Sequence, residues 1–118
     1  MRVLVLDNYD SFTYNIVHIL RELDDLDISV IKNDLIKMKE VNSYDKIILS
    51  PGPSLPKDAG KMNELILNYY DSKPILGICL GHQAIAENFG GKLYNMEEPL
   101  HGVQTDIYLE EDYIFKDI

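Results

Sequence analysis

The 118-residue chain has the length of one domain and is long enough to bury a single hydrophobic core. Apolar residues make up 46% and charged residues 26%, a composition typical of a folded globular protein that argues against disorder. Acidic residues number 20 against 11 basic ones, and the resulting net charge of −9 disfavours nucleic acid and anionic membranes as partners. No apolar run approaches the roughly 20 residues of a membrane span. The single cysteine excludes an internal disulfide and favours a reducing, cytoplasmic location.

The first element expected is a strand over residues 2–6 (RVLVL), a nearly continuous apolar run typical of a strand buried on both faces of a parallel sheet. A polar turn follows within residues 7–15. From Phe12 to Leu23 apolar residues recur at helical spacing, which predicts a helix with Phe12 in the core and an N-cap at one of the two preceding polar residues. Residues 28–31 (ISVI) predict a second strand.

The same alternation continues along the chain. A short helix is expected over residues 35–41, a strand over 46–49 (KIIL) and a helix through 62–69. A fourth strand over 74–79 (PILGIC) then leads directly into a helix over 80–89, which two glycines close.

Strands that alternate with helices predict an α/β fold with three layers, in which a mostly parallel sheet carries helices on both faces. After Gly91 the pattern weakens, and residues 92–96 and 105–109 are candidate strands. Ligands of such sheets bind at the carboxyl ends of the strands. The polar turns expected at those ends are residues 7–11, 50–60 and 79–83.

The strongest chemical signal is the strand-to-helix turn at residues 77–83 (GICLGHQ). It has the glycine–x–nucleophile–x–glycine form of a nucleophile elbow, with Cys79 as the nucleophile. Such a turn strains the nucleophile's backbone and leaves room only for glycine at positions 77 and 81. The helix N-terminus favours the thiolate, and the N–H of Leu80 points toward an oxyanion formed on the substrate. The alternative, a cysteine that merely fills the core, does not explain the flanking glycines.

A second signal is SPGP at residues 50–53, which follows a strand and therefore lies on the same edge of the sheet as Cys79. Its two prolines rigidify the loop. Gly52 lets a substrate approach the backbone and can offer its N–H. On its own, the motif fits an ordinary proline-rich turn equally well.

Together with DNYDSFTYN at residues 7–15, these motifs resemble those of the class I glutamine amidotransferases. GICLGHQ marks the whole class, and DNYDSFT narrows the resemblance to the glutaminase subunit (component II) of anthranilate synthase or aminodeoxychorismate synthase. The resemblance implies a flavodoxin-like class I glutaminase fold that needs no cofactor or metal. Glutamine would be attacked by a cysteine, and the resulting glutamyl thioester would be hydrolysed. The ammonia would pass to a larger chorismate-binding synthase subunit, component I.

By this resemblance Cys79 is the nucleophile, and the N–H groups of Gly52 and Leu80 form the oxyanion hole. Gln83 would hold the amino-acid end of glutamine, although an exposed helix glutamine is an equally good interpretation of that residue. The other substrate-binding residues implied by the resemblance are Pro51 and Gly81.

The family's catalytic base is a histidine of a His-x-Glu pair. His18, His82 and His101 are followed two residues later by leucine, alanine and valine, so none of them matches. The chain is therefore expected to form the N-terminal portion of a glutaminase domain, incomplete at its C-terminus and inactive alone. Two loop positions also depart from the family pattern, with Ser54 in place of a glycine and Val103 in place of a lysine.

Several functions remain open at this point. A protein that serves 4-aminobenzoate synthesis fits as well as one that serves anthranilate synthesis, with anthranilate slightly favoured. A GMP synthase glutaminase shares GICLGHQ but is disfavoured by DNYDSFT. A non-catalytic module that binds a partner is consistent with the missing His-x-Glu pair. A flavodoxin-like binding domain is disfavoured because no glycine-rich loop follows the first strand.

Overall fold

Four parallel strands form the centre of the molecule. A computed structural model describes residues 1–118 and orders the sheet β2-β1-β3-β4. The strands are β1 (Arg2–Asp7), β2 (Asp27–Lys32), β3 (Lys46–Leu49) and β4 (Ile75–Gly77). Val3 of β1 pairs in register with Ile28 of β2 and with Lys46 of β3. The predicted parallel sheet is confirmed, and the carboxyl ends of its strands lie along one edge.

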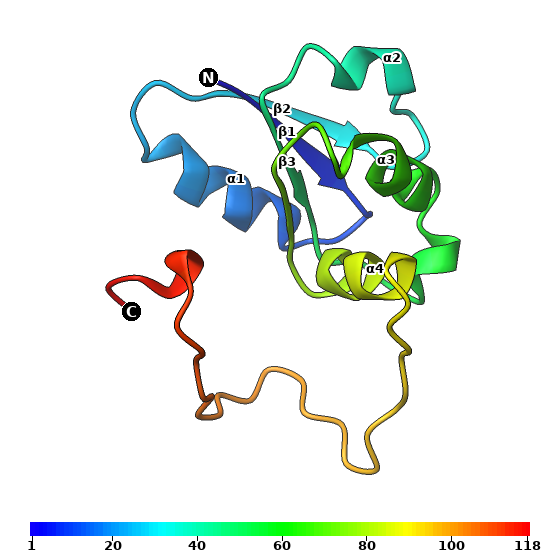
Figure 1. Cartoon of the computed structure of the whole chain (residues 1–118), viewed down its shortest axis with the longest axis vertical. Helices are drawn as coiled ribbons and strands as arrows, with labels where there is room; N and C mark the ends of the chain where they lie inside the picture. The colour runs from blue at the N-terminus through cyan, green and yellow to red at the C-terminus, as the bar shows by residue number, and fades with distance from the viewer.

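Helices lie on both faces of the sheet, as predicted (Figure 1). They are α1 (Thr13–Arg21), α2 (Met38–Val41), α3 (Met62–Tyr69) and α4 (Leu80–Asn88), with two 3₁₀ turns, η1 (Pro56–Asp58) and η2 (Tyr113–Phe115). Side chains alternate along β1 and so divide the core in two. Leu4 and Leu6 join the larger apolar cluster beneath α3 and α4, whereas Val3 and Val5 pack with Val17 of α1.

The face that carries α1 is only partly covered. This helix packs against β1 and β2. Over the other half of the face, an apolar hollow of about 480 Å³ is lined by Ile48, Leu76, Ile114 and neighbouring residues. Leu76 of β4 is accordingly 53% exposed. None of the helices is long and apolar enough to cross a membrane.

The prediction for the core face of α1 was right for Ile16 and Leu20, which pack against the smaller apolar cluster, and wrong for Phe12 and Ile19. Phe12 is 60% exposed and Ile19 63% exposed, whereas Thr13 and Val17 are buried against the sheet. The reason is that Phe12 precedes the helix as its N-cap residue and supplies no capping side chain. Asp10 instead accepts a hydrogen bond from the Phe12 N–H at 2.8 Å, which forms an Asx-type turn before the helix.

The strands predicted over residues 92–96 and 105–109 are also absent. Residues 92–112 contain no helix or strand, and the segment runs out from the body before returning at η2 (Figure 1, yellow to red). An apolar run becomes a strand only where a neighbouring strand pairs with its backbone, and neither run has such a neighbour among residues 1–118. The short helix predicted over 35–41 is likewise reduced to α2.

Candidate functional site

The turn between β4 and α4 has the geometry of a nucleophile elbow. Strand β4 ends at Gly77 and α4 begins at Leu80, so Cys79 is the residue that reverses the chain direction. Its φ of 53° and ψ of −108° lie in a region that non-glycine residues rarely adopt. Strain of this kind persists only where the surrounding structure enforces it. The elbow presents Cys79 as an exposed free thiol at the N-terminus of α4.

The two glycines of the motif are required by close packing, as the sequence predicts. A Cβ atom at Gly77 would lie 2.5 Å from the backbone of Gly81 and His82. A Cβ atom at Gly81 would lie 2.6 Å from the Cβ and carbonyl oxygen of Leu49 in β3. Each distance is shorter than Cβ contacts in proteins allow. The first turn of α4 therefore packs directly on the ends of β3 and β4, which fixes the position of Cys79.

The SPGP loop lies beside this elbow. A Cβ atom at Gly52 would lie 2.7 Å from Cδ2 of Leu80 and 2.6 Å from Cβ of Asn8. The backbone of Gly52 thus packs between the turn after β1 and the first residue of α4. The structure therefore brings Gly52 and Leu80, the two residues predicted to donate oxyanion N–H groups, into contact next to Cys79.

The other predicted site residues also belong to this edge of the sheet. Gln83 is exposed on the first turn of α4, where its N–H donates to the carbonyl of Cys79 at 3.0 Å. Pro51 is half-buried, and its carbonyl accepts the Ser50 hydroxyl at 2.7 Å. Gly81 is buried beneath the turn. Gln83 is thus open to solvent, and Pro51 is partly so.

The histidines do not meet Cys79 through any hydrogen bond or ion pair. His82 is exposed on α4, and His101 lies in the exposed C-terminal segment. The one histidine with a carboxylate neighbour is His18, whose Nε2 lies 4.0 Å from Glu22 on the exposed surface of α1.

A buried polar network at the same edge was not anticipated from the sequence. Asn8, Asn33 and Ser50, which follow β1, β2 and β3, are only 2%, 5% and 0% exposed. The Asn33 side-chain amide donates to Oδ1 of Asn8 at 3.1 Å, and the Asn8 amide donates to the carbonyl of Ser50 at 2.8 Å. Polar residues that directly follow adjacent parallel strands converge at one edge, and this was the signal that could have predicted the network.

The turn after β1 is organised by a buried carboxylate. Asp7 accepts hydrogen bonds from the Thr13 hydroxyl at 3.0 Å and the Tyr9 N–H at 2.9 Å, and Lys32 lies 3.3 Å away. Burial alone would raise the pKa of Asp7, but hydrogen bonds from Thr13 and Asp10, with Lys32 nearby, outweigh it and hold the pKa below the usual value.

Tyr9 extends this arrangement to the surface. Its hydroxyl donates to Asp34 at 2.6 Å, a bond that raises the pKa of Tyr9 above its usual value because the neutral phenol is the donor. Lys32 also lies over the ring, 4.2 Å from its centre. The turn that carries Asn8 is therefore held on both sides, by buried Asp7 and by exposed Tyr9.

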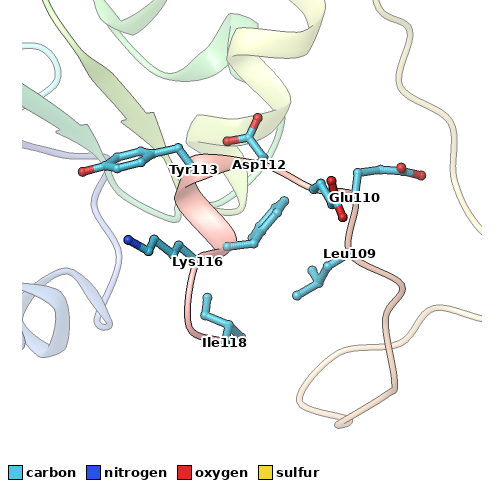
Figure 2. Close-up of a pocket in the computed structure, with 8 residues that line it drawn as sticks. Leu109, Glu110, Asp112, Tyr113, Lys116 and Ile118 are labelled. Atoms are coloured by element: carbon cyan, nitrogen blue, oxygen red, sulfur yellow. The ribbon is translucent and has the colours of Figure 1, made fainter.

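Hollows elsewhere on the molecule do not include Cys79. The one shown in Figure 2 has a volume of about 530 Å³ and is enclosed only by residues 109–118. It mixes acidic side chains such as Glu110 and Asp112 with Tyr113 and Ile118, and it belongs to the exposed C-terminal segment. No group of three or more histidine, cysteine, aspartate or glutamate side chains is arranged to hold a metal ion.

Comparison with known proteins agrees with this geometry. Residues 4–118 match the family described as glutamine amidotransferase class-I. The chain is 50% identical over 108 residues to anthranilate synthase component 2 of Lactococcus lactis, which covers 89% of this chain and 52% of that protein. It is 43% identical over 116 residues to the aminodeoxychorismate/anthranilate synthase component 2 of Bacillus subtilis, covering 97% of this chain and 59% of that protein.

A solved structure supports the same fold. The crystal structure of a protein described as a GMP synthase subunit, from Thermoplasma acidophilum, superposes with a TM-score of 0.74 at 31% identity, covering 86% of this chain and 51% of that one. An α/β fold with a strained cysteine at a strand-to-helix turn agrees with the class I glutamine amidotransferases. The chain belongs to the glutamine amidotransferase class-I family. It spans about half the length of the curated relatives it matches.

Proposed function

We propose that this protein is the glutaminase subunit of a chorismate-using synthase, with anthranilate synthase as the favoured assembly. The observation that carries the proposal is the strained, exposed Cys79 at the head of α4, with Gly52 packed on Leu80 beside it. Relatives named anthranilate synthase component 2 and aminodeoxychorismate synthase component 2 support the substrate and the partner. The free, exposed thiol also suits a reducing, cytoplasmic compartment.

The geometry supports nucleophilic catalysis on the side-chain amide of glutamine. The Cys79 thiolate attacks the amide carbon, a sulfur–carbon bond forms, and the carbonyl oxygen becomes an oxyanion. The N–H groups of Gly52 and Leu80 stabilise that oxyanion. The carbon–nitrogen bond then breaks, the nitrogen takes up a proton and leaves as ammonia, and water hydrolyses the thioester to glutamate. Gln83 and Pro51 line the approach of the substrate, whereas Gly81 is buried and instead lets the first turn of α4 pack closely on β3.

Proton transfer is the step that residues 1–118 do not support. The leaving nitrogen must be protonated and the attacking water deprotonated, and a positioned acid–base contributes about 10²- to 10⁴-fold to each such step. None of the three histidines is hydrogen-bonded to Cys79, and His18 has its carboxylate neighbour on exposed α1. We therefore assign residues 1–118 to the nucleophile-bearing, N-terminal portion of the glutaminase domain. By itself, this polypeptide should release ammonia from glutamine at no useful rate.

The test is ammonia release from glutamine, measured for the 118-residue chain and for a form extended to the full length of its curated relatives, called the complete protein below, each with and without a chorismate-aminating subunit. The proposal predicts turnover that depends on the complete protein and is abolished by Cys79→Ser. Turnover that survives Cys79→Ser would contradict the assigned nucleophile. Tight binding of the partner without turnover under every condition would instead identify a non-catalytic module.

The identity of the product separates the two chorismate pathways. Relatives of both kinds match the chain over nearly its whole length, since the anthranilate synthase component 2 of Thermus thermophilus covers 98% of it and the aminodeoxychorismate synthase component 2 of Escherichia coli covers 97%. In the assembled synthase, glutamine-dependent formation of anthranilate supports the favoured pathway. Formation of aminodeoxychorismate alone would assign the protein to 4-aminobenzoate synthesis.

A further inference from the structure

The buried network behind Gly52 ties together the ends of three strands. Asn8 follows β1, Asn33 follows β2 and Ser50 follows β3, and all three are almost completely buried. Asn8 makes four contacts here: its N–H donates to the Ser50 hydroxyl at 2.9 Å, its side-chain amide donates to the Ser50 carbonyl at 2.8 Å and lies 3.3 Å from the Met62 sulfur, and its Oδ1 accepts from Asn33. Every buried side-chain polar atom finds a partner.

The chemistry of the network fixes which way each group points. The Ser50 backbone carbonyl can only accept, so the atom of Asn8 that faces it must be the amide nitrogen. The Oδ1 of Asn8 is thereby directed at Asn33, whose amide nitrogen donates to it. The Ser50 hydroxyl accepts from the backbone N–H of Asn8 and donates onward to the Pro51 carbonyl at 2.7 Å. Asn8 thus holds the loop after β3 at two points, with its side chain at the Ser50 carbonyl and with its backbone N–H at the Ser50 hydroxyl.

That loop contains Gly52, which sits directly against Asn8. A Cβ atom at Gly52 would lie 2.6 Å from Cβ of Asn8 and 2.8 Å from its carbonyl oxygen, so the two backbones leave no space between them. Hydrogen bonds hold the Ser50 and Pro51 carbonyls, and the peptide unit that carries the Gly52 N–H is the one whose carbonyl belongs to Pro51. Because a peptide unit is planar, fixing the Pro51 carbonyl also fixes the direction of the Gly52 N–H.

We infer that Asn8, held in place by Asn33 and acting through Ser50, is a positioning residue that aims the Gly52 N–H at the oxyanion. This rests on the proposed function, because it assigns a supporting role within the same site. A donor helps the transition state only when it is held in place before the reaction. Isosteric replacement of Asn8 or Asn33 by aspartate removes the side-chain amide N–H donor of that residue and leaves the size of the side chain unchanged. The loop that carries Gly52 then loses its fixed direction.

The experiment compares two reagents that modify Cys79 in the 118-residue chain. Chloroacetone alkylates the thiolate: a sulfur–carbon bond forms and chloride leaves. An oxyanion donor that binds the carbonyl oxygen of the reagent speeds this reaction. Methyl methanethiosulfonate transfers its methylthio group to the thiolate: a sulfur–sulfur bond to Cys79 forms, the bond to the sulfonyl sulfur breaks, methanesulfinate leaves, and no carbonyl group takes part. The ratio of the two rates therefore reports the oxyanion donors, whereas a change in stability or thiolate content alters both rates together.

The variants are Asn8→Asp and Asn33→Asp, with Gly52→Ala as a direct perturbation of the loop. Asn88→Asp is the matched control, because Asn88 donates to Asn63 at 2.7 Å in another asparagine pair, at the far end of α4 from Cys79. Each folded fraction is checked by circular dichroism. If Asn8→Asp does not fold, Asn33→Asp and Ser50→Ala provide the same test, since both leave Asn8 in place.

The inference predicts that the ratio of the chloroacetone rate to the methyl methanethiosulfonate rate is well above that of the urea-unfolded chain in the wild type. Asn8→Asp and Asn33→Asp should lower the ratio about tenfold, a part of the roughly 10²-fold lost when an oxyanion donor is removed. Asn88→Asp should leave it unchanged. A ratio lowered by Gly52→Ala but not by Asn8→Asp or Asn33→Asp would overturn the inference and leave the proposed function intact. A wild-type ratio equal to that of the unfolded chain would overturn the oxyanion role of Gly52 itself, and the inference with it.

Discussion

The substitution Gly77→Ala should shift the position of Cys79 although it leaves the cysteine itself unchanged. The added Cβ would lie 2.5 Å from the carbonyl carbon and oxygen of Gly81 and from the amide nitrogen of His82. All three atoms are backbone of the first turn of α4, so no side-chain rotation relieves the clash. The distance falls about 0.9 Å short of the 3.4 Å at which ordinary contact begins, so the head of α4 must move away from β4 by a comparable amount.

Two effects of similar size follow from that displacement. Overpacking costs about 1 to 3 kcal/mol of folding stability, and a clash confined to backbone belongs at the upper end of that range. For a domain of this length, each kcal/mol lowers the melting temperature by about 4 °C, so a decrease of roughly 10 °C is expected. A misplacement of about 1 Å lowers a catalysed rate on the order of 10²-fold, or about 2.7 kcal/mol, so the reactivity of Cys79 should fall even in the molecules that remain folded.

The measurement pairs urea unfolding with the rate of Cys79 alkylation by chloroacetone, both on the folded chain. Gly90→Ala is the control, because a Cβ there meets no atom within 4 Å and the substitution is strained only by the φ of +92°. Gly90→Ala should cost about 1 to 2 kcal/mol and leave the alkylation rate unchanged. Wild-type stability and alkylation in Gly77→Ala would refute the argument that close packing of β4 against α4 sets the elbow.

Three further predictions concern the loop, the turn after β1 and the partner. In the complete protein, Gly52→Ala should lower glutamine turnover by about 10²-fold while leaving the protein folded. Near-normal turnover would show that SPGP is an ordinary turn without a catalytic role. The pKa of Asp7 is lower in the folded state than in the unfolded state. The ionised carboxylate therefore contributes its full share to the free energy of unfolding above the unfolded-state pKa of about 3.9, and that contribution is lost as the pH falls through the folded-state pKa. The gap in unfolding free energy between wild type and Asp7→Asn should therefore be widest above about pH 5 and close toward pH 2, and a gap independent of pH would contradict this. Tyr14 is 61% exposed on the helix that follows this turn, so Tyr14→Ala should weaken binding to the synthase partner without loss of stability, which a pull-down and thermal melting together can check.

The sheet and the elbow could be predicted from sequence because both depend on local pattern. Continuous apolar runs mark strands that are buried on both faces, and residues 2–6 and 46–49 are such runs. The glycines at 77 and 81 marked the elbow because their spacing around Cys79 is a local pattern, although the atoms that exclude a side chain at Gly81 belong to Leu49 of β3. The contact between Gly52 and Leu80 followed from topology, since both come after the carboxyl ends of parallel strands.

The features that sequence missed depend on contacts between distant segments. Phe12 shares helical spacing with Ile16, yet it precedes the first residue of α1 and stays exposed, whereas Val17 enters the core. Asn8 and Asn33 are 25 positions apart, and neither has a local pattern that distinguishes a buried amide from an exposed one. The apolar residues between 92 and 109 suggested strands, but a strand needs a pairing partner that no local pattern can supply.

The most direct test of the central claim is to trap the covalent intermediate. The complete protein, assembled with its synthase partner, is mixed with glutamine, quenched in acid and analysed by intact-mass and peptide mass spectrometry. The account predicts one added glutamyl group on Cys79 that hydroxylamine releases and that Cys79→Ser lacks. Sustained glutamine hydrolysis by Cys79→Ser, or a glutamyl group attached to any other residue, would contradict it.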